Sequence, residues 1–576
     1  MFRKLLPSIG KYKIYAILTP IMMMGEVAME IFIPSIMATI IDDGIKGGKG
    51  VGYIAKMGLI MAVMSAVSLI FGTLGAYFGS KASMGFAKNL RGRLFTKIQD
   101  FSFANVDKFS TASLVTRLTN DITNTQMAFM MLIRMAFRAP VMLVGAVIMA
   151  VRVKPDLSTI FLISVPFLAL ALVLIMTKAH PRFRSMLDKY DRMNADVQEN
   201  LIGIRAVKAF VREDYEKEEF RKSAEGVRKA QVFAEKLIIL NGPIMQLTMY
   251  GTILAILWFG GNMVIDRTFE IGNLSAFITY ATQILSSLMM VSMLLMMFVI
   301  SRASIGRIVE VLDEEIDIKD DEAEDFEVID GTVEFKDVTF GYNKTAEEPV
   351  LKNVNLKINS GETIGIIGGT GSAKTTLVSM ISRLYDVDGG EVLVGGRNVK
   401  DYKLEKLRDK VAVVLQKNVL FSGTIRDNLK WGDAEATDEE IVEACKAAQA
   451  HDFIMSFPDQ YETDLGQGGV NVSGGQKQRL CIARALLKKP KIVILDDSTS
   501  AVDTATDAAI RKAFREKLDD TTTIIIAQRI TSVMDSDRIV VLEDGKIDGV
   551  GTHDELMKNN EIYREVYLSQ QKGSEL

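Results

Sequence analysis

Six long runs of apolar residues fill the first half of this 576-residue chain. Each is about 20 residues or longer, which is enough to cross a hydrocarbon core of ~30 Å as an α-helix whose backbone hydrogen bonds are satisfied internally. The first run exceeds the apolar core of a cleavable signal peptide and five comparable runs follow it, so we expect it to stay in the protein. The expected spans are residues 14–41, 54–78, 127–151, 157–177, 237–265 and 274–300.

Basic residues in the loops set the expected orientation, because Lys and Arg are retained on the cytoplasmic side of a membrane. The loop between the second and third spans carries seven of them, and the segment from Lys178 to Lys236 carries fourteen, whereas the other three loops carry five in total. We therefore predict a multi-pass protein of the cytoplasmic membrane. Its N-terminus, both long loops and the whole second half are expected in the cytoplasm.

Two features of the first half carry charge at or in the membrane. Residues 1–13 mix apolar and basic side chains, which predicts a short helix at the inner interface, with a frayed basic terminus as the alternative. Charged residues inside spans are functional candidates. Two pairs of them have members one helical turn apart: Glu26 with Glu30, and Arg134 with Arg138. They are open to three interpretations: they line a pathway for cationic cargo, they neutralise one another, or they lie beyond the bilayer. We favour the last two, which are structural, for Glu26, Glu30, Arg134 and Arg138.

From about Asp313 onward, charged residues and glycines recur every few positions, as in a water-soluble domain. A net charge of -4 and a pI near 5.8 give no support for a nucleic-acid partner. Neither Cys445 and Cys481 nor the three scattered histidines have metal-ligand spacing, and a disulfide is not expected in the cytoplasm. We expect a helical membrane domain over 1–312, a linker over 313–330 and a water-soluble α/β domain over 331–576.

A Gly-rich segment predicts where a nucleotide binds. Residues 362–367 are expected to form a buried parallel strand, and a helical run begins near Leu377. A strand, a Gly-rich turn and a helix start together present backbone N–H groups to phosphate. Lys374 is then expected to reach the β- and γ-phosphates of ATP, and Thr375 to hold Mg²⁺. The phosphate loop consists of Gly368, Gly369, Thr370, Gly371, Ser372, Ala373, Lys374, Thr375 and Thr376.

One residue of this loop departs from the usual pattern, because Ala373 stands where a glycine normally precedes the lysine. A Cβ is tolerated there if φ is negative, so we expect a negative φ and retained nucleotide binding. About 120 residues later, residues 492–496 form a continuous apolar run that ends in Asp496, as expected of a central parallel strand. Asp496 is predicted to hold the Mg²⁺ shell opposite Thr375.

The segment between these two motifs indicates one particular protein family. Val472-Ser473-Gly474-Gly475-Gln476, followed by Lys477-Gln478-Arg479, resembles the signature motif of ATP-binding cassette (ABC) proteins. Other landmarks of that family match in register: Tyr342 in Phe-Gly-Tyr, Gln416 before residues 419–425, and Ser500-Ala501-Val502-Asp503 after the strand. Six spans before one cassette resemble a half-transporter of the ABC exporters with the type IV fold, over essentially the whole chain.

The resemblance implies roles for several further residues. Tyr342 would stack on adenine, and Gln416 would contact Mg²⁺ and the attacking water. Two cassettes of this family dimerise head to tail, so the γ-phosphate held by one chain would meet the signature of the other, namely Ser473, Gly474, Gly475 and Gln476. The resemblance also implies docking of the long loops on the cassettes, near residues 103–109 and 200–207.

Three positions depart from the family pattern. Asp497 replaces the glutamate that polarises the attacking water, and its carboxylate is withdrawn by roughly one C–C bond, ~1.5 Å. Gln528 replaces a histidine and cannot carry the positive charge that stabilises the transition state. Gln467, before the signature, stands where a glutamate is common. The site built on this phosphate loop is therefore predicted to be slow or inactive.

These departures favour a heterodimer, because a homodimer would contain two defective sites. A second half-transporter would supply a competent phosphate loop, completed by the signature of this chain, as in heterodimeric bacterial multidrug-type exporters. We predict ATP-driven export of small amphipathic drugs, lipids or peptides from the lipid membrane by alternating access. No peptidase domain precedes the first span, which argues against a peptidase-containing exporter. The alternatives are a slow homodimeric exporter and a non-pumping assembly, either an ATP-gated channel or a membrane sensor.

Overall fold

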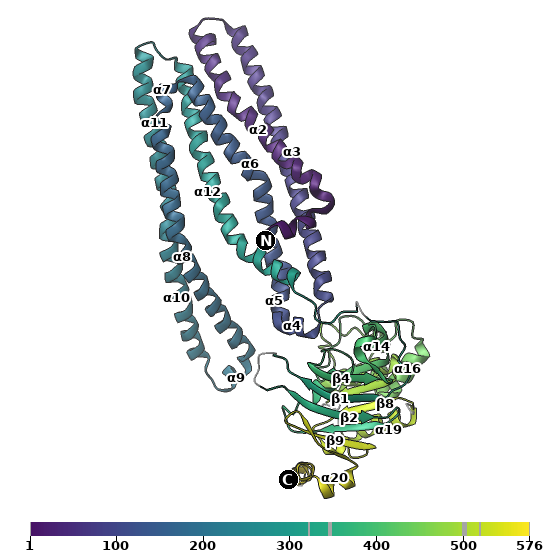
Figure 1. Cartoon of the computed structure of the whole chain (residues 1–576). Coiled ribbons are helices and arrows are strands. Elements are labelled where there is room, and N and C mark those ends of the chain that lie inside the picture. Colours follow the sequence, from purple (N-terminus) through teal and green to yellow (C-terminus); the bar gives the residue numbers. More distant parts are fainter. Residues whose placement is uncertain (1, 321–322, 344–347, 498–503, 518–519, 575–576) are drawn as a thin grey trace. The chain divides into compact units, whose positions relative to one another are not determined.

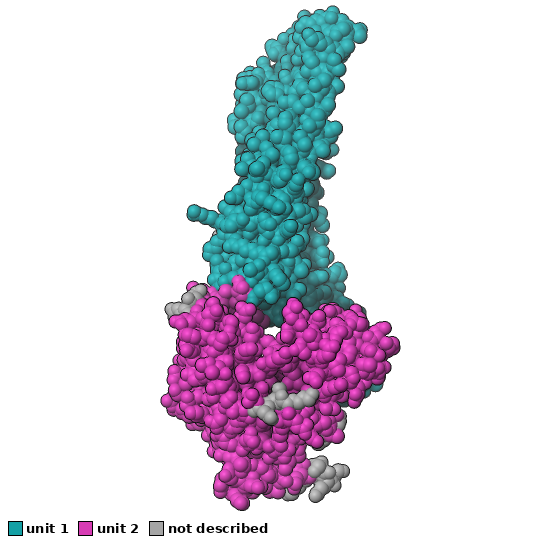
Figure 2. All heavy atoms as spheres, turned by 90° about the vertical axis from the view of Figure 1, so that its right-hand side faces the viewer, with its two compact units in different colours: residues 1–99, 110–314 teal, residues 100–109, 315–576 magenta. Residues whose placement is uncertain are grey.

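The computed structural model describes residues 2–320, 323–343, 348–497, 504–517 and 520–574. The chain divides into two compact units, which are considered separately below (Figures 1 and 2). Unit 1 consists of Met1–Gln99 and Ser110–Glu314, and unit 2 of Asp100–Phe109 and Glu315–Leu576. A ten-residue segment from the first long loop therefore belongs with the second half of the chain.

In the described residues of unit 1, every secondary-structure element is a helix, and six of the helices are long and apolar enough to cross a membrane. This confirms the six predicted spans, although α3, α8 and α12 continue beyond residues 78, 177 and 300, where their apolar runs end, to Gln99, Ile202 and Asp313. The extensions are polar and continue the same helices away from the apolar segments. The six helices are α2 (Lys13–Thr39), α3 (Val51–Gln99), α6 (Ile122–Val153), α8 (Phe161–Ile202), α11 (Asn241–Ile265) and α12 (Ile271–Asp313).

Further helical segments connect these spans. The antiparallel pair formed by α8 and α10 packs along its length, and α9 lies at its tip (Figure 1). The segments are η1 (Leu6–Tyr12), η2 (Ile40–Lys46), α5 (Thr111–Thr116), η3 (Arg117–Asp121), α7 (Pro155–Ser158), α9 (Ile204–Ala209) and α10 (Glu213–Ile239).

The N-terminal segment forms helical turns, α1 (Phe2–Leu5) and η1, that are fixed to α3. The side-chain amide of Asn89 donates to the carbonyl oxygen of Ser8 at 3.0 Å, and Arg93 donates to that of Lys4 at 2.9 Å. Lys4 also pairs with Asp313 at 2.6 Å. The segment is thus held by side chains of the same unit, rather than being a frayed basic terminus.

The charged residues in the spans largely neutralise one another. Arg138 of α6 lies between two carboxylates of α2, with Nη1 2.5 Å from Glu26 Oε2 and Nη2 3.0 Å from Glu30 Oε1. Arg134 lies one turn earlier, its aliphatic stem facing Gly79 of α3. Both glutamates therefore form ion pairs with Arg138. This favours the structural interpretation over a pathway for cationic cargo.

The described residues of unit 2 form two sheets, as expected of an α/β ATPase domain. The smaller sheet has the order β2-β1-β4-β5, and its neighbouring strands are antiparallel. The larger has the order β10-β9-β3-β8-β7-β6; all its neighbouring pairs are parallel except β10 with β9. The strands are β1 (Val333–Phe340), β2 (Leu351–Ile358), β3 (Thr363–Ile367), β4 (Gly389–Val394), β5 (Arg397–Asn398), β6 (Val411–Val414), β7 (Ile492–Asp496), β8 (Thr522–Ile526), β9 (Arg538–Glu543) and β10 (Lys546–Gly551).

The central strands are buried on both faces, because helices and the smaller sheet cover them. All five residues of β7 and of β8 are buried, which explains their continuous runs of Ile, Val, Leu and Thr. Since β3, β7 and β8 are parallel neighbours, their carboxyl ends meet at one edge of the sheet, where ligands bind in such folds. The helices of this unit are α4 (Phe103–Phe109), α13 (Lys374–Ser379), α14 (Leu404–Lys410), α15 (Ile425–Leu429), α16 (Asp438–Ala447), α17 (His451–Met455), α18 (Gly474–Leu487), α19 (Thr504–Lys517), α20 (His553–Asn559) and α21 (Glu561–Ser574).

Candidate nucleotide site

The phosphate loop runs from the end of β3 at Ile367 to the start of α13 at Lys374. Cβ atoms built on Gly369 and Gly371 would meet nothing within 4 Å, so the backbone at these positions borders open space. The Lys374 ammonium donates to the carbonyl oxygens of Gly368 at 2.9 Å and Gly369 at 2.8 Å. A bare, open backbone with an ammonium group over it fits the phosphates of a nucleotide.

Ala373 has a left-handed backbone, with φ of 73° and ψ of 23°. The expectation of a negative φ is therefore wrong, because the turn into α13 needs the conformation for which glycine is usual here. An L-residue with a Cβ pays about 1–2 kcal/mol in this region. The phosphate loop of this chain is strained at the residue that precedes its lysine.

Two oxygen ligands of the kind that Mg²⁺ prefers lie side by side next to the loop. Thr375 Oγ1 donates to Asp496 Oδ1 at 3.0 Å, joining the start of α13 to the end of β7. Burial raises the pKa of the Asp496 carboxyl, and the neighbouring Lys374 ammonium acts in the opposite direction. A hydroxyl and a carboxylate brought together beside a phosphate loop fit a hydrated Mg²⁺.

The next residue, Asp497, is the centre of a small hydrogen-bonded group. Its Oδ2 atom accepts from Gln528 Nε2 at 2.8 Å and from Gln416 Nε2 at 3.3 Å. Burial raises the pKa of the Asp497 carboxyl, whereas the two amides lower it. The structure thus brings together all three sequence-predicted residues of the hydrolytic centre, and both neutral amides face the carboxylate.

The signature segment begins α18 with a reciprocal cap. Ser473 is the N-cap, its hydroxyl accepts from Gln476 N at 3.3 Å, and Ser473 N donates to Gln476 Oε1 at 2.8 Å. The cap leaves the N–H groups of Gly474 and Gly475 at the start of a 14-residue helix, where they favour an anion. Lys477 donates to the Gly468 carbonyl oxygen at 2.8 Å, which ties the preceding loop, including Gln467, to the same helix.

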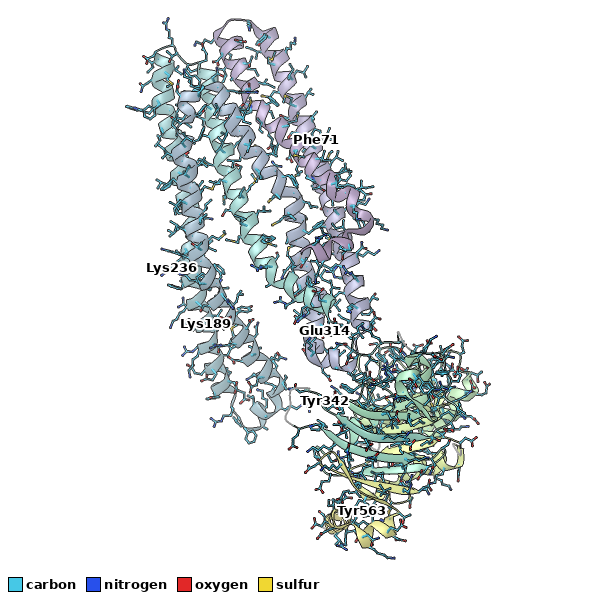
Figure 3. All side chains as sticks on the ribbon, in the orientation of Figure 1. Phe71, Lys189, Lys236, Glu314, Tyr342 and Tyr563 are labelled. Atoms are coloured by element: carbon cyan, nitrogen blue, oxygen red, sulfur yellow. The ribbon has the colours of Figure 1, made fainter. Side chains whose placement is uncertain are left out.

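Tyr342 lies at the end of β1, beside the phosphate loop, and is labelled in Figure 3. Its hydroxyl is 3.0 Å from Thr376 Oγ1, while its ring meets Phe340 and Tyr385 edge-on. The side chain remains 53% exposed. A half-exposed aromatic ring beside a phosphate loop is suited to stacking on a base.

Helix α4 of the first long loop contacts the ATPase domain within unit 2, as expected for residues 103–109. Asp107 accepts a hydrogen bond from the Tyr385 hydroxyl at 2.7 Å, and the Phe103 ring meets the Tyr385 ring edge-on at 6.1 Å. Tyr385 also contacts Tyr342, so one aromatic side chain bridges α4 and the expected adenine site.

Sequence reasoning named most of the residues that the structure brings together here, but it did not name one of them. Ser500, Ala501, Val502 and Asp503 lie outside the described residues. Gln570 of α21 was not predicted, although its side chain bonds to the loop that carries Gln528. No local motif marks it, since its partners lie about 40 residues earlier in the chain.

The strained alanine leads to a stability prediction. Ala373→Gly should raise the free energy of unfolding of the ATPase domain by about 0.5–1 kcal/mol, because relief of the left-handed strain exceeds the added chain entropy of glycine. Denaturant unfolding followed by tryptophan fluorescence measures this. The matched control is Ala508→Gly on the exposed side of α19, which should lower stability by about 1 kcal/mol. A loss at both positions would contradict the strain assignment.

Comparison with protein families agrees with this geometry. Residues 17–289 match the family described as ABC transporter transmembrane region, and residues 351–500 match the family described as ABC transporter. A Bacillus subtilis relative, the uncharacterized ABC transporter ATP-binding protein YfiB, is 39% identical over 575 residues, covering 100% of both chains.

Two further proteins resemble the chain over almost its full length. The putative multidrug export ATP-binding/permease protein YgaD of Bacillus subtilis is 31% identical over 590 residues and covers 99% of each chain. A solved bacterial Atm1-family ABC exporter with ATP bound has a TM-score of 0.82 at 24% identity, covering 97% of this chain and 98% of the other. The latter likeness shows the fold.

Proposed function

Because this chain belongs to the ABC transporter family and joins a transmembrane region to an ATPase cassette, we propose that it exports small amphipathic compounds as one half of a heterodimer. Its class is that of an ATP-driven exporter, a multi-pass membrane protein with a cytoplasmic ATPase domain. The observation that carries the heterodimer proposal is the hydrolytic centre, where two neutral amides hold the short carboxylate of Asp497.

The residues of the site have separate roles toward ATP. Tyr342 stacks on adenine, and the phosphate-loop amides with the Lys374 ammonium bind the β- and γ-phosphates. Thr375, Asp496 and Gln416 would hold Mg²⁺, and the ion would neutralise charge on the phosphates. These residues are all present and close to one another, so the site is suited to retaining ATP.

The site is poorly suited to the hydrolysis of ATP. Asp497 follows β7 directly, and its carboxylate stands ~1.5 Å short of the position that a glutamate would reach. A displacement of about 1 Å can cost on the order of a hundredfold in rate. Gln528 donates its amide to Asp497 and brings no positive charge to a γ-phosphate. This site therefore binds ATP and hydrolyses it slowly.

The competent site is built from both chains. The partner supplies the phosphate loop, a glutamate and a histidine, while this chain supplies the capped start of α18. There the N–H groups of Gly474 and Gly475 and the Ser473 hydroxyl face the partner's γ-phosphate. Hydrolysis at that site opens the dimer, and ATP held at the slow site keeps the cassettes associated between cycles.

A cavity on the cassette supports dimerisation. It measures about 410 Å³, and its lining includes Phe421 and Trp431, whose rings stack at 3.9 Å and are 41% and 62% exposed. Residues at the tip of the second long loop, around α9, are similarly apolar and exposed, with Ile202 at 78% and Phe210 at 79%. We assign this cavity to the second-loop tip of the partner chain, which would link its membrane helices to this cassette.

The chain purified alone is predicted to hydrolyse ATP at least tenfold more slowly than the chain co-purified with its partner. The partner is sought as a second half-transporter with glutamate and histidine at the positions of Asp497 and Gln528. ATPase rates at saturating Mg-ATP measure the difference, and equal rates per chain would indicate a slow homodimer instead.

Transport is tested separately, because a cassette assembly that only gates a channel would also hydrolyse ATP. ATP-dependent accumulation of an amphipathic dye against its gradient in inverted vesicles is expected for the exporter. Dissipation of a preformed dye gradient on ATP addition would identify a channel. The printed description of YgaD as a multidrug exporter favours drug-like dyes as first probes.

A further inference from the structure

We propose that Gln570 of the C-terminal helix α21 is a positioning residue for the ATP site, because its amide holds the loop that presents Gln528 to Asp497. The inference rests on the nucleotide site proposed above, but not on the heterodimer or the cargo. The Gln528 side-chain amide has two N–H donors, and the one not used toward Asp497 can donate to a γ-phosphate, so α21 would influence how long ATP stays bound.

Both ends of the Gln570 amide are bonded to the loop after β8. Its Nε2 atom donates to the Gln528 carbonyl oxygen at 2.7 Å, and its Oε1 atom accepts from Ile530 N at 2.9 Å. A side-chain amide that bonds to the C=O of one residue and to the N–H of the residue two positions later makes the same two hydrogen bonds that a neighbouring strand would make. The last hydrogen bond that the sheet makes to this segment is one residue before Gln528, where Ala527 N donates to the Ile366 carbonyl oxygen at 3.3 Å.

The helix that carries Gln570 is firmly anchored on the domain. Tyr563, labelled in Figure 3, is fully buried, and its hydroxyl lies 2.8 Å from His553 Nδ1. The Asn560 amide accepts from Tyr563 N at 2.7 Å and donates to Asp548 at 2.6 Å. Gln570 lies seven residues after Tyr563, two turns along the same helix face. A rigid anchor therefore determines where the Gln570 amide lies.

The contact reaches the hydrolytic centre in two steps. Gln570 fixes the backbone of Gln528, and the side chain of Gln528 donates to Asp497 at 2.8 Å. Asp497 N also donates to the Ile526 carbonyl oxygen at 3.0 Å, which ties the same strand end to the same site. Without Gln570, the Gln528 carbonyl oxygen would lose its hydrogen-bond donor. The side-chain amide of Gln528 would then no longer be held in its direction toward Asp497.

The test measures how long each chain keeps ATP. Full-length protein is loaded with 8-azido-[α-³²P]ATP and Mg²⁺, chased with unlabelled ATP, and photolysed at intervals, so that label on this chain reports its own site. Gln570→Ala is expected to speed release about tenfold. Gln570→Glu keeps an acceptor for Ile530 N but sets a carboxylate oxygen against the Gln528 carbonyl oxygen, so release at least tenfold faster is expected. Gln571→Ala is the control, because the Gln571 amide donates to the Tyr567 hydroxyl at 2.8 Å.

A double-mutant cycle separates positioning from general support of the fold. In a Gln528→Ala background, where the side chain facing Asp497 is gone, Gln570→Ala should speed release less than twofold further. Wild-type retention in Gln570→Ala, or an undiminished tenfold effect in the Gln528→Ala background, would overturn the proposal. If instead the wild-type chain takes up no label, the nucleotide site itself is refuted, so the two failures are distinguishable.

Discussion

Gly475→Asp is expected to lower steady-state ATP hydrolysis and transport of the assembled transporter by about 10² to 10³. Such losses are typical when an anion-stabilising contact of the transition state is removed. Gly475 lies in the first turn of α18, two residues after the Ser473 cap, where N–H groups favour a negative ligand. The aspartate places a like charge and added bulk where the partner's γ-phosphate docks.

The comparison variant is Lys374→Ala, which removes a phosphate contact from the site that we consider non-catalytic. It should weaken ATP retention on this chain and only partly reduce turnover. Ser473→Arg should resemble Gly475→Asp, and Gly226→Asp on α10, where an added Cβ meets nothing within 4 Å, controls for a new charge on a helix. An inactive Lys374→Ala together with an active Gly475→Asp would reverse the assignment of the two sites.

The second large effect that we expect is a gain in ATP hydrolysis. Asp497→Glu combined with Gln528→His should raise hydrolysis at this chain's own phosphate loop by about ten- to a hundredfold, because the longer carboxylate and the cationic donor restore base geometry and charge stabilisation. The rate is measured in the heterodimer after the partner's own glutamate has been changed to glutamine. Transport need not improve, since faster turnover at this site shortens the closed state.

A matched control keeps the histidine but removes the base. Asp497→Asn with Gln528→His should show no gain, because an amide cannot accept the proton of the attacking water. If Asp497→Glu with Gln528→His is also no faster than the unmodified site, another residue limits the reaction. The strained Ala373 is then the first candidate, and adding Ala373→Gly tests it.

Much of the fold could be predicted because lipid and parallel sheets impose simple patterns. The predicted strand over 492–496 coincides with β7, and the strand over 362–367 differs from β3 by one residue. The spans were found from their apolar runs, but α3 and α8 continue to Gln99 and Ile202. Hydropathy detects only the part of a helix that lies in lipid, so the polar extensions left no comparable signal.

The sequence by itself determined the order of the domains, the six spans, and the identity of the groups expected at the nucleotide site, because these depend on periodicity and on short motifs. Only the tertiary structure decided how those groups are held. It placed Ala373 in the left-handed region, paired Arg138 with Glu26 and Glu30, and set Gln570 against the loop of Gln528. Each depends on contacts or backbone geometry fixed by packing of the whole unit, and residues 42 or 108 positions apart in the chain share no local pattern that reveals them.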